Sequence, residues 1–405
     1  MEYFDEGSSE GFESGERHHT VYDEEEGYLS DDVSDTFAQL HFSTATYHNQ
    51  DNFTSLPPFV RKKEDMEIKD VVKDNVLRYL PAKSLMRFRS VSKEWDYWIR
   101  RPLLAHHQSY CFRDISGFFS QRSDRNPTFI TLNRAAYGVP TPSLGFLPEA
   151  VDIRSSSNGL ILCQGCNGCD SYYICNPANQ EWEELPKPTY YHGSEPAVVL
   201  VFEPSALNMG AHYHLICAVP LPDLPIVRFE MYSSKMRSWR ILDQNCVELE
   251  YSSFTGNGFY MKETAYWETS MRKILALDLK SKEYDIIPLP SESPPGGVLA
   301  RIQEELSYVG IRSYSGNQCS IEIYRGIQLN IRQRIDIHLE EVPGDIHGYR
   351  ILPCVHGDVV MILAGSFIYS YRLSDQRIEV ISREGVDLLA TNKILPYVNS
   401  LVSVA

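Results

Sequence analysis

Apolar positions recur with a helical period in residues 65–110, the first strongly patterned part of the chain. Between residues 68 and 80 one apolar face is formed by Ile68, Val71, Val72, Val76, Leu77 and Leu80. Pro81 is expected to end this helix, because proline lacks a backbone N–H and disfavours helix at the preceding residue. The pattern therefore predicts a first helix that stops at residue 80.

Two further short helices are predicted before residue 102. Their inward positions are Leu85, Phe88 and Val91 in the second and Trp95, Trp98 and Ile99 in the third. Ser92 is placed to cap the third helix, and Pro102 closes it. Three short helices bury little apolar surface on their own. We therefore expect the module to be stabilised by packing against a partner, against the following domain, or against both.

From about residue 117 the pattern changes to short β-type runs separated by polar turns. Several runs share one motif, an apolar strand, a polar turn and a second strand that carries an aromatic or apolar anchor. The anchors, at successive separations of 57, 45, 47 and 47 residues, are Trp182, Trp239, Tyr284, Ile331 and Ile378. A repeat of this length with several strands is typical of a propeller blade, and residues 117–405 leave room for about six.

Charge is distributed unevenly along the chain. Residues 1–50 hold 13 Asp plus Glu and one Arg, which makes −12 of the net −16. A segment so rich in Glu, Asp and Ser is predicted to be a disordered acidic tail, which with its linker spans residues 1–64. The rest of the chain is nearly balanced in charge, so no basic surface for nucleic acid is predicted.

Neither a membrane span nor a secretory leader is predicted. The longest apolar run, near residues 359–369, is interrupted by Gly365 and Ser366 and is far shorter than the roughly 20 residues that cross a bilayer. The first residues are acidic and lack an apolar signal-peptide core. The nine cysteines are not spaced as a disulfide framework. The sequence therefore predicts a reducing compartment, with a cytoplasmic or nuclear location or both.

Four cysteines within 13 residues, Cys163, Cys166, Cys169 and Cys175, raise the question of a metal site. A structural zinc site usually has two ligand pairs separated by a longer loop, and an iron–sulfur run has a different spacing before its last cysteine. The stretches GLILC and YYICN instead look like two neighbouring strands. Cys163 and Cys175 are then small apolar residues of the strands, and Cys166 and Cys169 belong to the loop. No metal or cofactor is predicted, and a metal-binding loop remains the less favoured alternative.

The helical stretch resembles the F-box, the short module that docks a substrate receptor onto the Skp-type adaptor of a cullin ubiquitin ligase. The resemblance is carried by LRYLPAKSLMRFRSVSKEW at residues 77–95. The runs FRDISGFFSQ, SSSNGLILC and YYICNPANQEWEELP look like the C-terminal domain of plant F-box proteins, a degenerate kelch-like propeller. The expected fold is thus an α+β multidomain chain, with a small three-helix F-box at residues 65–110 and an all-β propeller of about six blades at residues 117–405.

The resemblance also implies which residues face the adaptor. The candidates are Ile68, Val72, Leu77, Leu80, Pro81, Leu85, Phe88, Val91 and Trp95. Of these, Leu77, Phe88 and Trp95 suit the core of the module equally well. Two departures bear on adaptor affinity: the family's opening Leu-Pro is Ile68-Lys69 here, and a usual leucine of the first helix is Lys73.

The function implied is that of a non-catalytic receptor subunit, in which the F-box holds the adaptor, and through it a cullin, while the propeller binds a target protein for ubiquitination. The two departures favour an alternative, a propeller scaffold that no longer joins a ligase. The cysteine loop would support a third hypothesis, that the chain is a metal-binding protein. Target identity and the loops that bind the target are not encoded in any motif of the sequence.

Overall fold

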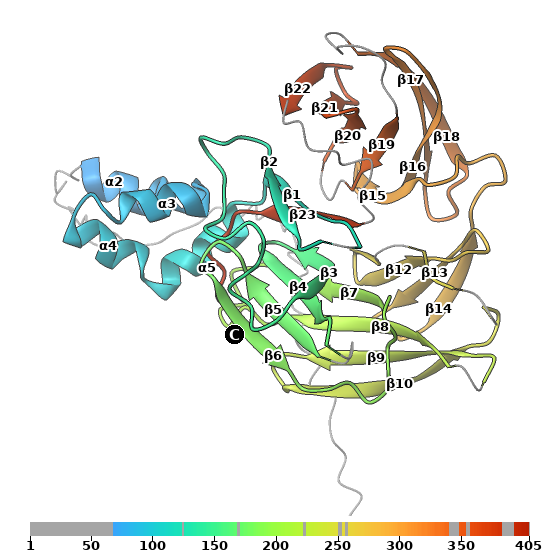
Figure 1. The fold of residues 1–405 in the computed structure, drawn as a ribbon, viewed down its shortest axis with the longest axis horizontal. Coiled ribbons are helices and arrows are strands. Elements are labelled where there is room, and N and C mark those ends of the chain that lie inside the picture. The colour runs from blue at the N-terminus through green and yellow to red at the C-terminus, as the bar shows by residue number, and fades with distance from the viewer. Residues whose placement is uncertain are drawn as a thin grey trace, which may run out of the picture. The chain divides into compact units, whose positions relative to one another are not determined.

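The computed structural model describes residues 68–123, 125–167, 171–221, 224–249, 253–255, 258–339, 348–353, 357–382 and 393–404. The predicted acidic tail, residues 1–64, lies outside this part of the chain. Helices occupy residues 68–111, and β-strands follow as far as residue 398 (Figure 1).

Among the described residues, the helical module has four α-helices and one 3-10 helix, where the apolar pattern predicted three helices. Its elements are α2 (Ile68–Asn75), the 3-10 helix η1 (Leu77–Tyr79), α3 (Ala82–Phe88), α4 (Lys93–Ile99) and α5 (Pro102–Cys111). The first α-helix ends at Asn75 rather than at residue 80, and Pro81 is the extended N-cap of α3. Pro102 stands at the start of α5, where its missing N–H costs no helical hydrogen bond.

The strands of the described part of the chain form six antiparallel sheets, the blades of a propeller, which confirms the predicted number of about six. Five sheets contain four strands that are consecutive in the chain. Their bounds are β3 (Val151–Ser157), β4 (Leu160–Gly165), β5 (Tyr172–Asn176) and β6 (Glu181–Leu185); β7 (Ala197–Val201), β8 (His214–Pro220), β9 (Val227–Ser233) and β10 (Ser238–Cys246); β11 (Phe259–Met261), β12 (Thr264–Glu268), β13 (Lys273–Asp278) and β14 (Tyr284–Pro288); β15 (Val298–Ile302), β16 (Glu305–Ser315), β17 (Gln318–Arg325) and β18 (Ile331–His338); and β19 (Tyr349–Leu352), β20 (Val359–Ala364), β21 (Phe367–Arg372) and β22 (Ile378–Ser382).

The sixth sheet joins the two ends of the propeller. It consists of β1 (Ile115–Gln121), β2 (Thr128–Thr131) and the last strand, β23 (Lys393–Val398). β1 pairs with β23 in antiparallel register, with Phe119 opposite Leu395. The red β23 accordingly lies beside the early strands β1 and β2 in Figure 1. Pairing of the first strand with the last closes the ring of sheets and leaves fewer free strand edges.

The sequence repeat corresponds to the outer strand of each four-stranded blade. Its anchors fall on the fourth strands β6, β10, β14, β18 and β22, at Trp182, Trp239, Tyr284, Ile331 and Ile378. All five occupy the first or second residue of their strand. The repeat of about 47 residues therefore measures one blade.

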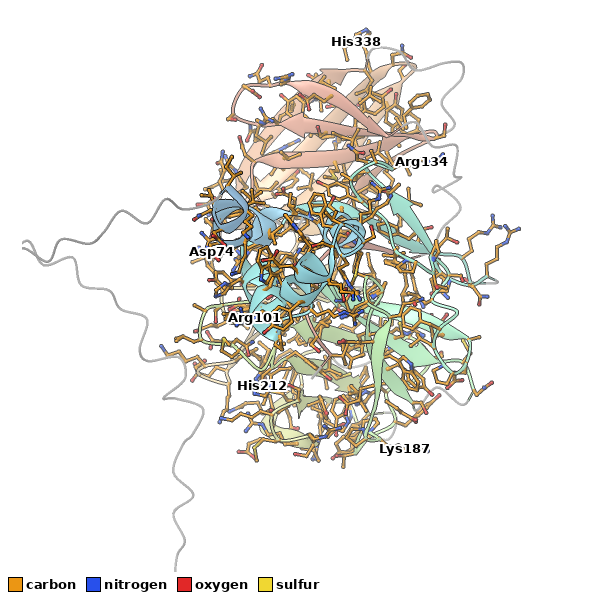
Figure 2. The ribbon with its side chains drawn as sticks, turned by 90° about the vertical axis from the view of Figure 1, so that its left-hand side faces the viewer. Asp74, Arg101, Arg134, Lys187, His212 and His338 are labelled. Carbon is orange, nitrogen blue, oxygen red and sulfur yellow. The ribbon has the colours of Figure 1, made fainter. Side chains whose placement is uncertain are left out.

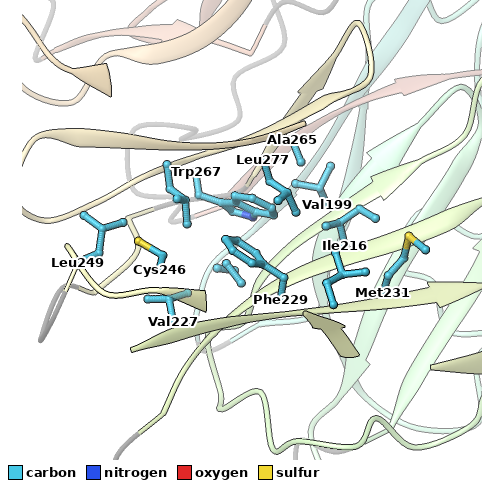
Figure 3. Packing of buried hydrophobic residues seen from close by; sticks show 14 of the residues in the cluster. Val199, Ile216, Val227, Phe229, Met231, Cys246, Leu249, Ala265, Trp267 and Leu277 are labelled. Atoms are coloured by element: carbon cyan, nitrogen blue, oxygen red, sulfur yellow. The ribbon is translucent and has the colours of Figure 1, made fainter. Parts of the chain in front are cut away.

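The core of the propeller lies between neighbouring blades. One apolar cluster joins β7–β10 to β11–β14, with the Phe229 and Trp267 rings 6.2 Å apart (Figure 3). Five further clusters each combine residues of two successive sheets, and one of them links β19–β21 to β1 and β23 through Leu352, Leu363 and Phe118. Burial between sheets thus continues around the whole ring.

The two faces of the propeller differ in what covers them. Asn399 and Leu401, which follow β23, contact the helices, and we call this side the helix face. At the other end of β23, Lys393 Nζ lies 3.6 Å from Asp152 Oδ2 and 3.2 Å from Glu195 Oε1. These two acidic residues stand at the start of β3 and just before β7. We call this opposite side the far face.

Candidate functional site

The helical module has no separate core, because its apolar cluster includes propeller residues. Leu77 and Leu85 are fully buried, together with Ile99, against Ala178 and Leu401 of the propeller. Around them pack the partly buried Val72, Leu80, Met86, Trp95, Leu104 and Ala105. Of the predicted supports (a partner, the following domain or both), packing against the following domain is confirmed.

A buried hydrogen-bond network joins the same two parts. Gln108 of α5 is fully buried; its Nε2 donates to Leu80 O at 3.0 Å and to Asn399 O at 3.3 Å, and its Oε1 accepts from Leu401 N at 2.7 Å. Asn399 is also fully buried, and its Oδ1 accepts from Lys83 N at 2.9 Å. The Ala82 N–H donates to Asn399 O at 2.8 Å. Because every one of these groups has a partner, the network fixes the helices against the end of β23.

Side chains of α3 add a second attachment, to the segment after β2. Lys83 Nζ donates to Tyr137 O at 2.8 Å and also to Arg134 O, and Arg87 Nη1 donates to Ala135 O at 3.1 Å. Burial, and next the charge of Arg87, lower the pKa of Lys83. The Lys-Ser-Leu part of the motif therefore serves the junction with the propeller through Lys83 and Leu85.

The turn between α3 and α4 is organised by capping and by aromatic contacts. Ser92 Oγ accepts from Trp95 N at 3.2 Å, which confirms the predicted N-cap. The Trp95 ring packs edge-on against Phe88 at 5.6 Å and lies 5.9 Å from Trp98. These contacts pack three aromatic rings together at the exposed edge of the module.

The nine candidate adaptor-facing residues fall into three groups by exposure. Leu77, Pro81 and Leu85 are buried, and Val72, Leu80 and Trp95 are partly buried. Ile68, Phe88 and Val91 are exposed, at 82%, 37% and 63%. Only the exposed and partly buried residues are accessible to a partner. Figure 2 views the molecule from the side of the helical module and labels Asp74 on α2 and Arg101 before α5.

Two predictions about this surface need correction or refinement. The prediction that Val91 points inward is wrong: α3 ends at Phe88, and Val91 lies in the following turn, where its side chain is exposed. Lys73, which replaces a family leucine, has its ammonium 4.7 Å from the centre of the Trp98 ring. A cation above an aromatic face is favourable, so the module accommodates this lysine without burying a bare charge.

The cysteines Cys163 and Cys175 lie where the strand pattern predicted. They sit on the paired strands β4 and β5 within one apolar cluster, and both are fully buried. Burial, and next the hydrogen bond to Cys175, raise the pKa of the Cys163 thiol well above its ordinary value. Cys166 is exposed in the turn, and Cys169 lies outside the described residues. Within the described ranges no three His, Cys, Asp or Glu side chains are grouped so as to hold a metal ion.

Sequence reasoning missed a loop on the far face that is held by buried charges. Residues 186–196 connect β6 to β7, and the fully buried Glu230 accepts from Thr189 N at 2.7 Å and from His192 Nε2 at 3.0 Å. Arg154, 2% exposed, pairs with Glu195 at 2.8 Å. This loop displays Tyr191, which is 66% exposed. No local signal in the sequence indicates this loop, because Glu230 alternates with apolar residues in VRFEMYS as an outward-facing polar residue would.

The far face also carries a cavity of about 460 Å³ between two blades. It is lined by the end of β16 and the start of β19, with the Tyr314 and Tyr349 rings 4.9 Å apart. Tyr349 Oη donates to Gly316 O at 2.5 Å, which orients its ring. A half-open pocket with aromatic walls and polar edges is of a size that accepts a side chain or a short segment of another molecule.

None of the helices in the described part of the chain is both long and apolar enough to span a membrane.

Comparison with known families gives two matches. Residues 70–107 match the F-box domain, and residues 145–304 match the family described as "F-box protein At3g26010-like, beta-propeller". Among proteins of Arabidopsis thaliana, the chain is similar to F-box protein At5g07610 (29% identical over 55% of this chain and 56% of that protein) and F-box protein At5g49610 (30% identical over 54% and 63%). It is also similar to F-box protein At3g26010 (23% identical over 66% and 67%). The first of these matches spans little more than half the length of the relative.

Proposed function

We propose that this chain, which carries an F-box domain and an At3g26010-like β-propeller domain, is the substrate-recognition subunit of a Skp-cullin-F-box ubiquitin ligase. The helical module docks a Skp-type adaptor, and the propeller binds the target protein. The subunit performs no bond chemistry of its own. It acts by proximity, since a target held near a ubiquitin-charged enzyme reacts at a high effective concentration.

The observation that carries this proposal is the exposure of apolar side chains on helices that are fixed on their other side. Ile68 and Val91 leave 82% and 63% of their side chains in water, while Leu77 and Leu85 anchor the same module to the propeller. Further exposed apolar side chains of the module are Val71, Val76, Tyr79, Tyr97 and Leu103. Apolar groups presented on a rigid helical frame are typical of a helix-mediated protein interface, in which a few anchors carry most of the energy.

The arrangement separates the two binding tasks. The helices meet the propeller on its helix face, through Asn399 and Gln108. The ordered 186–196 loop and the tyrosine-walled cavity lie at the far face. A target bound there would be presented away from the adaptor, and the buried junction would keep its position relative to the adaptor constant. The far face is therefore the side that we assign to the target.

The test is co-expression of the full chain with a Skp-type adaptor, followed by gel filtration. Wild type is expected to form a 1:1 complex, and Ile68→Asp and Val91→Asp are expected to lose it, because each places a charge in an apolar interface. Ile327→Asp is the matched control, since Ile327 of the propeller is also 82% exposed. Leu80 and Pro81 are less suitable positions, because Leu80 O accepts from Gln108 and Pro81 is buried at the junction.

Each result has a definite meaning. A complex that survives both Ile68→Asp and Val91→Asp would exclude this surface as the adaptor site. A folded wild type that never binds the adaptor would exclude the receptor function. It would favour the scaffold alternative, for which Ile68-Lys69 and Lys73 are the relevant departures from the F-box pattern.

A further inference from the structure

A second cavity lies in the helical module, beside the core residues Leu77 and Leu104 and the exposed Leu103. The cavity has a volume of about 270 Å³ and lies between α2, η1, α4 and the first turns of α5. Its walls include Lys73, Arg78, Trp98 and Arg101. Four of its nine lining residues are charged, and the other five are apolar except for His107.

Positive charge is in excess around this cavity. Lys73, Arg78 and Arg101 are cationic, whereas Asp74 is the one acidic residue that lines it. Among the residues that the structure describes, no ion pair or side-chain hydrogen bond joins any of these three cations to a partner. Arg78 Nε is buried and has no acceptor. Lys73 and Arg78 each lie against an aromatic ring, that of Trp98 and that of Tyr79, which offsets part of their charge. Three cations against one carboxylate still leave a net positive charge, which favours an added anion.

Neighbouring groups reinforce the preference for an anion. Burial, and next the charges of His106 and Arg78, lower the pKa of His107, which shows that its ring faces positive charge. Leu103 and Leu104 of the first turn of α5 also line the cavity, and the positive end of a helix dipole favours anions. Trp98 forms the apolar floor and holds the Lys73 ammonium 4.7 Å from its ring centre.

We propose that this cavity is a binding site for a phosphate-class oxyanion, free or carried by a phosphorylated side chain. Arg78 and Arg101 would supply planar donors to its oxygens, and Lys73 would supply a point charge. A doubly charged tetrahedral group matches three cations better than a single carboxylate does. The inference does not depend on the proposed ligase function, because it concerns the isolated chain.

The test is isothermal titration calorimetry of the full chain at low ionic strength with three probes: inorganic pyrophosphate, O-phosphoserine and succinate. Pyrophosphate or O-phosphoserine is expected to bind with 1:1 stoichiometry, and the tighter of the two identifies the source of the phosphate. Arg101→Gln and Lys73→Gln are each expected to weaken binding roughly tenfold, the effect of losing one charge-assisted contact. Lys93→Gln is the control, since Lys93 is an exposed cation of α4 that does not line the cavity.

Three results would overturn the proposal. They are absence of saturable binding of either phosphate probe, equal affinity for succinate, and unchanged affinity in Arg101→Gln. Lys73→Gln could disturb the packing on Trp98. Arg101 is exposed and outside the apolar cluster, so Arg101→Gln tests the cavity without disturbing that packing. Far-UV circular dichroism of each variant verifies that the fold is retained.

Discussion

Replacing Gln108 by leucine should loosen the helical module while leaving the propeller folded. Leucine has nearly the volume of glutamine but cannot form the three hydrogen bonds to Leu80 O, Asn399 O and Leu401 N. Asn399 O keeps its bond from the Ala82 N–H, so two backbone groups, Leu80 O and Leu401 N, lose their partner. The change therefore acts at the junction between the helices and the end of β23.

The expected loss of attachment free energy follows from these two backbone groups. A buried backbone group left without a partner costs about 1–3 kcal/mol, and burying leucine instead of an amide returns part of that. We expect the module to lose about 3 kcal/mol of attachment free energy, which corresponds to roughly a hundredfold rise in the population of the detached helices.

Hydrogen–deuterium exchange measures this attachment directly. Amides of α2, α3 and α4 should exchange much faster in Gln108→Leu than in wild type, and amides of β8 and β13 should not change. The matched control is Gln121→Leu, another buried glutamine, which donates to Val151 O and accepts from Ile153 N inside the propeller. It should raise exchange in β1 and β3 and leave the helices unaffected. Unchanged helical exchange in Gln108→Leu would refute the idea that this network holds the module.

Two further predictions concern stability. Trp98 is 8% exposed, so Trp98→Ala should lower the free energy of unfolding by about 3–5 kcal/mol. Trp95→Ala should lower it clearly less, because Trp95 is only partly buried. Equal losses for the two variants, measured by urea denaturation, would contradict the packing described. Burial raises the pKa of Glu268 from 4.5 to about 7, so the folded state retains a proton that the unfolded state releases above 4.5. The free energy of unfolding should therefore fall as pH rises from about 4.5 to 7, and this fall should be smaller in Glu268→Gln. Identical pH profiles for the two proteins, measured by urea denaturation, would contradict this assignment.

Local patterns in the sequence were enough to predict the architecture. Anchors such as Trp182 and Tyr284 recur at blade spacing, because each blade repeats the same succession of inner and outer strands. Ser92 was recognisable as a cap, and the strand placement of Cys163 and Cys175 followed from the apolar runs around them. The resemblance to plant F-box proteins, read from residues 77–95 and the first blade, is confirmed by the family matches.

The helical module was less predictable, because apolar periodicity does not tell which neighbour covers a face. Val91 fits a helical spacing from Leu85 and Phe88, yet α3 ends before it. Leu85 was expected at an adaptor surface, but it is buried against Leu401, more than 300 residues away in sequence. Pairings over such distances leave no local trace.

The sequence by itself determined the repeating blades, the capped short helices and the acidic character of the tail, since each depends on residues that are close in the chain. Tertiary structure decided which apolar residues remain exposed, how Gln108 and Asn399 fix the helices, and where Glu230 holds a far-face loop. It also gathered Lys73, Arg78 and Arg101 around one cavity. For Gln108 and Asn399 the physical reason is closure of the ring, because pairing of β23 with β1 brings the end of the chain beside its helices. The neighbours of Glu230 and of the three cations come from other contacts between residues far apart in the chain, which no local pattern specifies.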